Sequence, residues 1–530
     1  MSHIVRCWLA CVVGAWLLVQ PAAARPLVYC SEGEPEGFNP ALYTSGTTFD
    51  AGARQIFERL VEFAPGGTAI VPGLAETWTI SDDGLTYTFR LRRGVRWQTT
   101  RDFTPTREFN ADDVVFSFVR QWRDSHPYHR ISGGQYPYFA SHGMGDKIAD
   151  LVRVDDFTVQ IRLQRTEAAF LAELAMDFAS IHSAEYADRM LRAGTPQEFD
   201  LRPVGTGPYA LSNYARGSAI RYVPHPGYWR GPARDELIFA ITPDAGTRVA
   251  KLRTGECDVM ALPNPADAAT LARDARYRVL ETPSLGVSYI ALNTEKAPFN
   301  DVRVRRALNH AIDKDAIIRA VFNGAAQPAA SPLPPAVWAH NADAKAPAYD
   351  PAEARRLLAE AKLPANTTVT PWAMPVSRPY NPNARLMAQL VQADLAAVGI
   401  RAEIVTYEWA DYLLRSRNGE HDMVTIGWIS DNGDPDNFLT PLLSCASAQN
   451  GENRARWCNP RMDALLREAS RTSDVARRTT LYREAQAIFA EELPWIAIAY
   501  PPNVTVLRAD VQGYRANPFG LHAFYGASVN

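Results

Sequence analysis

Four cysteines constrain the fold of this chain more than any other feature of its 530 residues. They are Cys30, Cys257, Cys445 and Cys458, and all four follow the N-terminal segment that contains Cys7 and Cys11. An even number of cysteines in an exported chain indicates disulfides, and four cysteines allow three pairings. A zinc site is the alternative, but the C-x2-C spacing that would support it is absent.

One of the three pairings has consequences for the whole fold. Cys445 and Cys458 flank a short polar stretch, and closing a loop of this size would stabilise the fold by roughly 3 kcal/mol. That pairing would leave Cys30 for Cys257. If these two pair, the mature N-terminus lies beside a mid-chain segment, and one domain is built from separated stretches of the chain.

The first 24 residues predict export. Arg6 precedes the apolar run Cys7–Val19, and the small residues Ala22, Ala23 and Ala24 follow. A positive start, a short apolar segment and an A-x-A site are typical of a cleaved signal peptide. A membrane anchor is the alternative, but the run is too short to span a bilayer. We therefore expect an exported mature chain that begins near Arg25.

The length of the chain exceeds what one hydrophobic core supports, so two or three domains are expected. Hydrophobic residues make up 47% and charged residues 21%, the balance of a globular protein. The formal net charge of -3 provides no basic field for nucleic acid and no polybasic membrane patch.

Alternating apolar and polar residues predict strands in "LTYTFRLRRGVRW" and "FTVQIRL", and Asn110 is a candidate N-cap for a helix. The second half of the chain indicates a layered α/β domain. There we expect a helix from Asn300 or Asp301 to Gly324, and another that begins at the Asp350-Pro351 cap. A third helix should end at Gly399, before a strand over 400–407.

Motifs of catalysis are missing. The chain has no G-x-S-x-G, no H-E-x-x-H and no G-x-x-x-x-G-K-[ST], and its ten histidines show no paired ligand spacing. "VGTGPY", residues 204–209, lacks the third glycine of a dinucleotide loop and predicts a tight crossing between domains instead. No enzyme activity, cofactor or metal is expected.

Three carboxylates follow the apolar segment "MVTIGW", in "GWISDNGDPDNF". Asp434 and Asp436 fit a solvated loop in which both act as turn formers, and the spacing does not match a calcium loop. Asp431 comes directly after the apolar strand, so its carboxylate should be partly desolvated and should need a cation beside it.

Arg378 lies between apolar residues and a proline-rich turn, in "WAMPVSRPYNPNAR". A guanidinium held there offers a rigid fork that suits a carboxylate ligand. An ordinary ion pair with a neighbouring acid is the equally open alternative.

These segments, together with "LVYCSEGEPEGFNPALYTSGTTFDA", "RPVGTGPY" and "DVRVRRALNHAIDKDAII", resemble the peptide/nickel-type (family 5) solute-binding proteins of ABC importers, in particular their dipeptide-binding branch. The resemblance covers essentially the whole mature chain. It implies an α/β, two-lobed periplasmic binding protein (type II, cluster C) with an extra domain in the first lobe and the ligand buried between the lobes. The implied division is a signal peptide over 1–24, lobe 1 over 25–56, 208–282 and 500–530, the extra domain over 57–207, and lobe 2 over 283–499.

The resemblance also implies roles for individual residues. Asp431 would take the α-ammonium of a dipeptide and Arg378 its carboxylate, while Trp409 and Tyr380 line the pocket. The remaining implied contacts are Thr44, Ser45 and Gly46 from the opposite lobe, and Gly427, Trp428, Ile429 and Ser430 pairing their backbone with the peptide. The implied disulfides are Cys30–Cys257 and Cys445–Cys458, and Ser377, Ile429 and Ser430 are where specificity is expected to vary.

The function that the resemblance implies is delivery of dipeptides to inner-membrane permease subunits with their ATPases, by a monomer that a chemoreceptor could also recognise. Alternative ligands on the same fold are a tripeptide, glutathione, haem or 5-aminolevulinate. An exported peptide hydrolase is the alternative of another class, but the chain shows no nucleophile–base pair or metal site for it.

Overall fold

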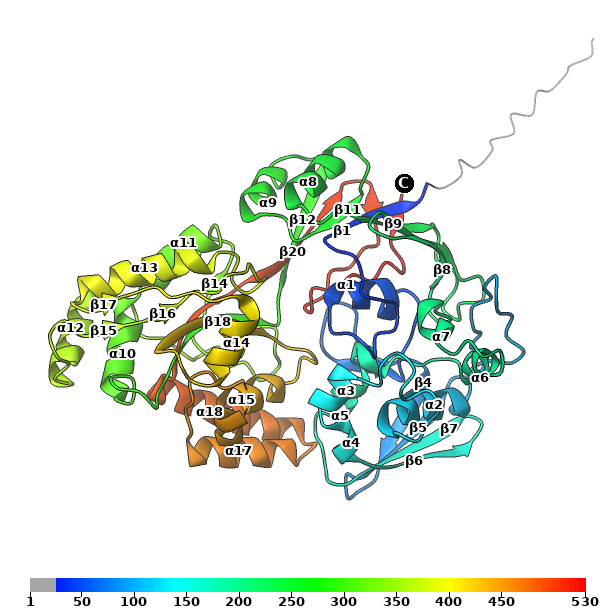
Figure 1. The fold of residues 1–530 in the computed structure, drawn as a ribbon, viewed down its shortest axis with the longest axis horizontal. Helices are drawn as coiled ribbons and strands as arrows, with labels where there is room; N and C mark the ends of the chain where they lie inside the picture. The colour runs from blue at the N-terminus through cyan, green and yellow to red at the C-terminus, as the bar shows by residue number, and fades with distance from the viewer. Residues whose placement is uncertain (1–24, 451) are drawn as a thin grey trace, which may run out of the picture.

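The computed structural model describes residues 25–450 and 452–530, so the predicted signal peptide lies outside the described part of the chain. Three larger sheets organise it. In Figure 1 the five-stranded sheet and its helices lie at the left, the four-stranded sheet lies at the lower right, and the seven-stranded sheet runs across the top.

The seven-stranded sheet combines both ends of the described chain with its middle. Its strands, in spatial order, are β12 (Tyr277–Pro283), β20 (Pro502–Arg508), β11 (Val259–Ala261), β1 (Leu27–Ser31), β10 (Leu237–Ile241), β9 (Ala219–Pro224) and β8 (Tyr209–Ala215). Helices α8 (Ala245–Thr254) and α9 (Pro265–Leu271) pack beside it, and β21 (Val511–Gln512) pairs with β22 (Ser528–Val529). The Cys30–Cys257 disulfide joins β1 to the segment before β11, which confirms that the mature N-terminus lies beside the middle of the chain.

The four-stranded antiparallel sheet contains the two strands predicted from alternation. Its order is β4 (Ala75–Ile80), β5 (Thr86–Leu91), β7 (Thr158–Leu163) and β6 (Ile148–Asp155), and a hairpin of β2 (Val61–Phe63) and β3 (Ile70–Pro72) precedes it. The short helices at the start are α1 (Gly46–Thr48) and η1 (Phe49–Ala53). Those packed around the sheet are α2 (Ala111–Trp122), α3 (Pro137–Ser141), α4 (Met144–Lys147), α5 (Phe170–Leu174), η2 (Asp177–Ala179), α6 (Ala184–Arg192) and α7 (Glu198–Leu201).

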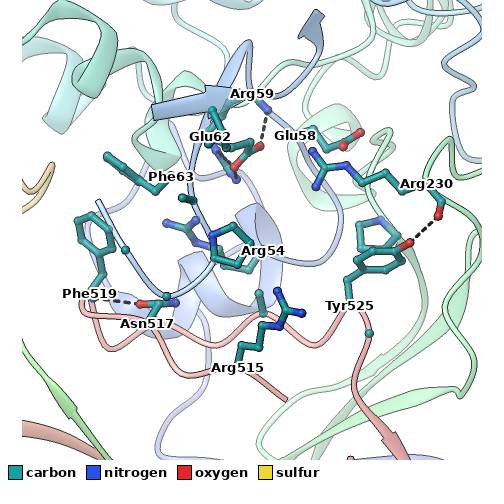
Figure 2. A pocket seen from close by; sticks show the side chains of 18 of the residues that line it. Arg54, Glu58, Arg59, Glu62, Phe63, Arg230, Arg515, Asn517, Phe519 and Tyr525 are labelled. Carbon is teal, nitrogen blue, oxygen red and sulfur yellow. Dashed lines mark hydrogen bonds and ion pairs between the residues drawn. The ribbon is translucent and has the colours of Figure 1, made fainter. Parts of the chain in front are cut away.

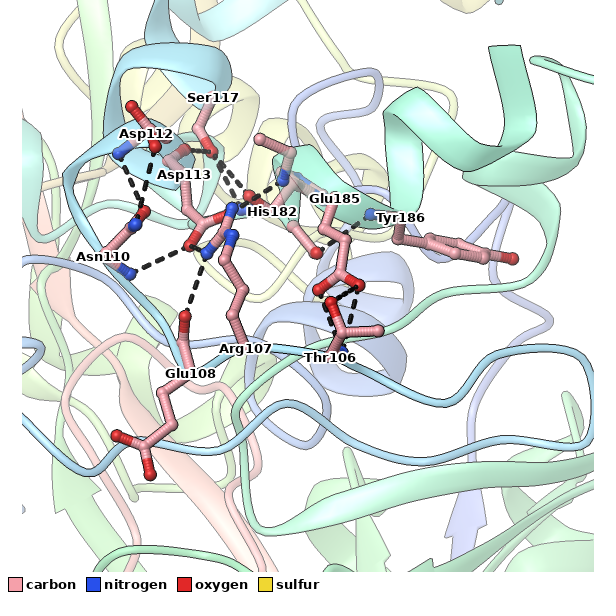
Figure 3. A network of polar contacts seen from close by, with 12 residues as sticks. Thr106, Arg107, Glu108, Asn110, Asp112, Asp113, Ser117, His182, Glu185 and Tyr186 are labelled. Atoms are coloured by element: carbon pink, nitrogen blue, oxygen red, sulfur yellow. Dashed lines mark hydrogen bonds and ion pairs between the residues drawn. The ribbon is translucent and has the colours of Figure 1, made fainter. Parts of the chain in front are cut away.

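The predicted cap at Asn110 is confirmed, and it belongs to a larger polar network (Figure 3). The Asn110 side chain accepts from the Asp112 N–H, and the Asp113 carboxylate accepts from the Asn110 N–H at 3.0 Å. Asp113 also accepts two hydrogen bonds from Arg107, at 2.7 and 2.8 Å, and one from the Ala184 N–H at the start of α6. This buried carboxylate therefore ties together the first turns of two helices.

The five-stranded sheet has the order β14 (Gln327–Pro328), β19 (Trp495–Tyr500), β13 (Gly286–Leu292), β18 (Met423–Ile429) and β16 (Pro371–Trp372), and β15 (Thr368–Val369) pairs with β17 (Arg401–Ala402) nearby. Its helices are α10 (Val302–Ala311), α11 (Lys314–Val321), α12 (Pro351–Glu360), α13 (Ala384–Ala397), α14 (Trp409–Arg417), α15 (Asp436–Leu443), α16 (Cys445–Asn450), α17 (Pro460–Ser470) and α18 (Val475–Glu492). The second disulfide joins Cys445 to Cys458.

Two predictions in this part of the chain were wrong in extent. The expected helix to Gly324 is divided into α10 and α11, because the Asp313 side chain accepts from the Ala316 N–H at 2.8 Å and starts a new helix. The expected strand over 400–407 is limited to β17 and an isolated bridge at Val405. Asp350 caps α12 as predicted.

Two strands pass from the seven-stranded sheet into the five-stranded sheet. β12 continues into β13 through Ser284 and Leu285, and β19 continues into β20 through Pro501. The Ser284 hydroxyl donates to the Pro501 carbonyl, so the two crossings are joined where they pass each other. These two short segments connect the body that contains the five-stranded sheet to the body that contains the seven-stranded and four-stranded sheets. A connection of this kind permits rotation of the two bodies about it.

The glycines of "VGTGPY", which were predicted to mark a tight crossing between domains, lie against another part of the backbone. The Gly207 N–H donates to the Ile56 carbonyl at 2.8 Å, and a Cβ at Gly205 would collide with that same carbonyl. Glycine is required here because no side chain fits between the two chain segments.

We expect Gly205→Ala to lower the free energy of unfolding by about 1–3 kcal/mol, because the added methyl group must push two backbone segments apart. Gly67→Ala is the control, since a Cβ there has no neighbour within 4 Å. Urea denaturation checks both variants, and equal stability of the two would contradict the close approach.

Candidate ligand-binding site

The predicted ligand-contacting strand is β18, and one edge of its C-terminal half is free. On one side β18 pairs with β13 along its whole length, with Gly427 opposite Ser288 and Ile429 opposite Gly286. On the other side β16 ends at Trp372, which pairs with Val424. In the described part of the chain no strand pairs with Gly427–Ile429 on that side, so its backbone groups are available to an added strand.

Asp431 lies at the end of this strand and contacts the other body of the molecule. Its Oδ1 accepts a hydrogen bond from the Tyr138 hydroxyl at 2.9 Å, and its own N–H donates to the Asn437 side chain at 3.0 Å. Burial raises the pKa of the Asp431 carboxyl above its usual value, and the nearby His142 ring and the Tyr138 hydroxyl oppose part of that rise. Within residues 25–450 and 452–530, no lysine, arginine or histidine forms an ion pair with Asp431.

The sequence analysis missed Tyr138 and His142. They lie on α3 and just after it, more than two hundred residues from Asp431 in the chain, and nothing in the sequence connects them. The Ala168 N–H also donates to the Ser470 carbonyl at 3.0 Å, so the two bodies touch at more than one point near Asp431.

The prediction of a solvated loop for Asp434 and Asp436 was wrong. Asp434 does act as a turn former, but it is only 6% exposed and accepts from Arg478 of α18 at 2.7 and 2.9 Å. Asp436 begins α15 and accepts from the Thr440 hydroxyl at 2.7 Å, while burial and the Asp434 charge raise the pKa of Asp436 to about 6. Of the three carboxylates, Asp434 therefore has its cation inside the protein and Asp431 does not.

Arg378 lies in the loop between β16 and α13. Its backbone exchanges two hydrogen bonds with Asn381, at 3.0 and 2.9 Å, which fixes the turn. Its guanidinium lies over the Trp409 ring, 4.7 Å from the ring centroid. No carboxylate of the described residues pairs with it, so the ordinary ion pair considered from the sequence does not form.

Tyr380, in the same loop, packs against β18. A Cβ at Gly427 would collide with the Tyr380 ring and with the Val287 carbonyl, so glycine is needed for this contact. Trp409 stacks on Tyr412 at a centroid distance of 5.7 Å, and burial raises the pKa of Tyr380 to about 12. The fold thus brings Arg378, Tyr380, Trp409 and Gly427 together.

Thr44, Ser45 and Gly46 lie at the start of α1, where the Ser45 side chain accepts from the Thr48 N–H. Their hydrogen bonds remain within this segment, and among the described residues none reaches β18 or the Arg378 loop. Gly46 lies near Leu521 of the C-terminal segment. Ser430 donates from its backbone to Leu285 at 2.9 Å, and Trp428 donates from its indole to Asn437 at 3.3 Å.

A cavity of about 510 Å³ opens beside the Arg378 loop, between segments that the two crossings join. Its lining includes Ser377, Arg378 and Phe322, together with Leu262 and with Ala268 of α9. Most of its lining is apolar, and Asp431 does not line it. The volume is within the range of small-molecule sites.

Neither a metal centre nor a membrane span is found in the residues that the structure describes. No three His, Cys, Asp or Glu side chains there are grouped to hold a metal ion. None of the described helices is long and apolar enough to cross a bilayer.

Comparison with known proteins gives consistent matches. The model of the bacterial extracellular solute-binding proteins, family 5, matches residues 69–450. The dipeptide-binding protein of Escherichia coli K12 is 51% identical over 507 residues, which cover 96% of this chain and 95% of that protein. Heme-binding protein A of Haemophilus influenzae is 50% identical over 504 residues, 95% of this chain and 92% of that protein. The ABC transporter-associated periplasmic binding protein DppA from Helicobacter pylori, solved with the peptide STSA, aligns with a TM-score of 0.79 at 35% identity and covers 95% of this chain and 98% of its own.

The contrast between two neighbouring carboxylates can be tested on the ligand-free protein. Asp434→Asn should lower the free energy of unfolding by about 3–5 kcal/mol, because it leaves the buried Arg478 guanidinium without its counter-charge. Asp431→Asn should leave the free energy of unfolding unchanged or slightly higher, because its carboxylate has no cation to lose. Chemical denaturation measures both, and a large loss of stability in Asp431→Asn would mean that a protein cation pairs with Asp431.

Proposed function

Because the chain belongs to the family 5 bacterial extracellular solute-binding proteins and has their two-lobed α/β fold, we propose that it binds dipeptides as zwitterions between its lobes. Asp431 takes the α-ammonium of the dipeptide, and Arg378 takes the C-terminal carboxylate. Proteins of this family bind solutes rather than transform them, so the protein is a receptor and not an enzyme.

The observation that carries this proposal is the pair of unmatched charges. Among the described residues, the Asp431 side chain has only hydroxyl and amide partners, and the Arg378 guanidinium has only an aromatic ring. A dipeptide at neutral pH has one charge of each sign, and each charge needs a partner once water is excluded from it. Because an extended residue spans roughly 3.5 Å, the two charged ends of a dipeptide lie close together, and a longer peptide could not place both of its ends on the same two counter-charges.

The free edge of β18 supports the orientation of the ligand. The free edge runs along Gly427, Trp428 and Ile429 toward Asp431, so an extended peptide can lie there as an added strand, while the N–H of Ser430 is already bonded to Leu285. Tyr380 and Trp409 form the wall beside Arg378. Thr44, Ser45 and Gly46 contact the ligand from the opposite lobe, where Tyr138 is a further neighbour of its ammonium.

Haem binding is the second candidate function. It is favoured by the 50% identity to heme-binding protein A and by the largely apolar 510 Å³ cavity beside Arg378. Tripeptides, glutathione and 5-aminolevulinate remain alternatives on the same fold, and the relative solved with STSA holds a longer peptide than two residues.

Binding is coupled to transport through closure of the lobes. A ligand that contacts both lobes favours the closed form, as in periplasmic binding proteins that move about a hinge. The segment 1–24 directs secretion of the chain to the periplasm. There the closed form docks as a monomer on inner-membrane permease subunits of an ABC importer, and it is also open to recognition by a chemoreceptor. The lobes follow the division given above: 25–56, 208–282 and 500–530; the extra domain 57–207; and 283–499. The sheet membership of these segments supports it.

Removal of either charge of the ion pair between the peptide's α-ammonium and the Asp431 carboxylate should abolish most of the affinity for the dipeptide. Asp431→Asn should weaken binding of L-Ala-L-Phe by about 2–5 kcal/mol, and acetylation of the peptide's amino group should weaken binding to the unchanged protein by a similar amount. Isothermal calorimetry on protein freed of co-purified ligand, with its disulfides intact, gives both values.

The two changes should not add. N-acetyl-L-Ala-L-Phe should bind Asp431→Asn about as tightly as it binds the unchanged protein, because the same interaction is already lost. Additive losses would mean that the peptide ammonium binds at a group other than Asp431. Tight binding of haemin together with no binding of Ala-Phe would instead support haem binding as the function.

The affinity for dipeptides should also depend on pH through Asp431. Binding needs the ionised carboxylate, and burial raises the pKa of Asp431 in the free protein. Affinity should therefore be constant between that raised pKa and the α-amino pKa of the peptide, near about 8, and should fall as the pH drops through the Asp431 pKa, at a higher pH than an ordinary aspartate would give. Calorimetry across the acidic range measures this, and Asp431→Asn should show no such fall; an identical profile in the variant would assign the titration to another group.

A further inference from the structure

The loop that carries Arg378 lines the cavity of about 510 Å³, so this cavity lies beside the carboxylate end of the proposed dipeptide site. Arg378 lines it together with both of its chain neighbours, Ser377 and Pro379. In a dipeptide whose carboxylate pairs with Arg378, the side chain of the C-terminal residue branches from the same carbon as that carboxylate. This side chain is therefore the part of the ligand that lies closest to the cavity.

The lining of this cavity carries little charge. Among the described residues, Glu281 is its only ionisable side chain besides Arg378. Six prolines line it, and because proline has no N–H, they offer no backbone donor to a polar group. Leu262, Phe322 and Val504 add larger apolar side chains. A charged side chain placed here would lose hydration without gaining a partner, whereas an apolar side chain would gain by burial.

The Asp431 end of the proposed site has different surroundings. Asp431 does not line this cavity, and the loop that follows it touches the other body. A Cβ on Gly433 would lie 2.6 Å from the Thr68 side chain and 3.6 Å from the Phe519 ring.

Phe519 also lines another cavity, of about 470 Å³, which is shown in Figure 2. Four arginines and two glutamates contribute to its lining: Arg54, Arg59, Arg230, Arg515, Glu58 and Glu62. The cavity on the side of the Asp431 loop is therefore lined by charged groups, whereas the cavity beside Arg378 is largely apolar.

We propose that the cavity beside Arg378 receives the C-terminal side chain of the ligand, so that the protein selects dipeptides with a large apolar C-terminal residue. This proposal rests on the proposed function and adds to it a side-chain preference that the two charge contacts alone do not give. The cavity volume is within the range of sites that hold whole small molecules, so an aromatic side chain can enter it. Burial of such a side chain should raise the affinity by roughly a factor of ten or more.

L-Ala-L-Phe and L-Phe-L-Ala are a matched pair of probes, because they have the same composition and charge and differ only in the end that carries the ring. Calorimetry on the intact protein, freed of co-purified ligand, should show at least tenfold tighter binding of L-Ala-L-Phe. L-Ala-L-Gly should also bind at least tenfold more weakly than L-Ala-L-Phe, because it places no side chain in the cavity.

A variant that fills the cavity tests the location of the ring. Ala269, on α9, lines the cavity, so Ala269→Trp should weaken binding of L-Ala-L-Phe at least fivefold and change binding of L-Ala-L-Gly less than twofold. Binding of L-Ala-L-Gly also shows that the variant is folded. Ala266→Trp is the matched control, because Ala266 is an exposed residue of the same helix that does not line the cavity. It should bind both peptides as the unchanged protein does.

Equal affinity for L-Ala-L-Phe and L-Phe-L-Ala, or tighter binding of L-Phe-L-Ala, would overturn this proposal and leave the proposed function standing. An Ala269→Trp variant that binds L-Ala-L-Phe unchanged, or that loses affinity for both peptides alike, would also overturn it. Absence of binding by all three peptides would overturn the proposed function and this proposal with it.

Discussion

The rest of this structure depends on a carboxylate that the protein does not neutralise. Asp434 is paired with Arg478 through two hydrogen bonds, whereas Asp431, three residues earlier, accepts a hydrogen bond from a tyrosine hydroxyl and meets no cation among the described residues. A carboxylate kept in partial burial without a counter-charge raises the free energy of the empty protein. In the proposed function, that cost becomes binding free energy when the ligand supplies the missing charge, and the Arg378 guanidinium, which pairs with no carboxylate of the described residues, takes the other end of the same molecule.

The fold places these groups where a ligand can connect the two bodies. β18 lies beside β13, and β13 continues through Ser284 and Leu285 into the seven-stranded sheet. Tyr138 reaches Asp431 from the body that carries the four-stranded sheet, so the anionic end of the site already lies at the contact between the bodies. Under the proposed function, a dipeptide held there would contact both bodies, and its binding would therefore shift the equilibrium between open and closed arrangements.

Local features of the fold could be predicted from the sequence, and distant contacts could not. The caps at Asn110 and Asp350 were predictable because an N-cap acts within one turn of its own helix. The close approach of two backbone segments at Gly205 was predictable because glycine lets backbones meet where a side chain would not fit. The burial of Asp434 depends on Arg478 in a helix 44 residues further on, and the partner of Asp431 lies 293 residues earlier, so neither contact leaves a local pattern. The break at Asp313 was missed because the apolar periodicity continues across it. The roles proposed for Asp431 and Arg378 came from resemblance to a family, and the structure adds that neither has a partner of opposite charge among the described residues.

A crystal structure of the protein with L-Ala-L-Phe tests the central claim most directly. The account predicts that the α-ammonium nitrogen of the peptide lies about 2.8 Å from an Asp431 carboxylate oxygen, and that its terminal carboxylate forms a bidentate contact with the Arg378 guanidinium. A bound peptide whose charged ends meet other groups, with the side chains of Asp431 and Arg378 turned away from it, would contradict the account.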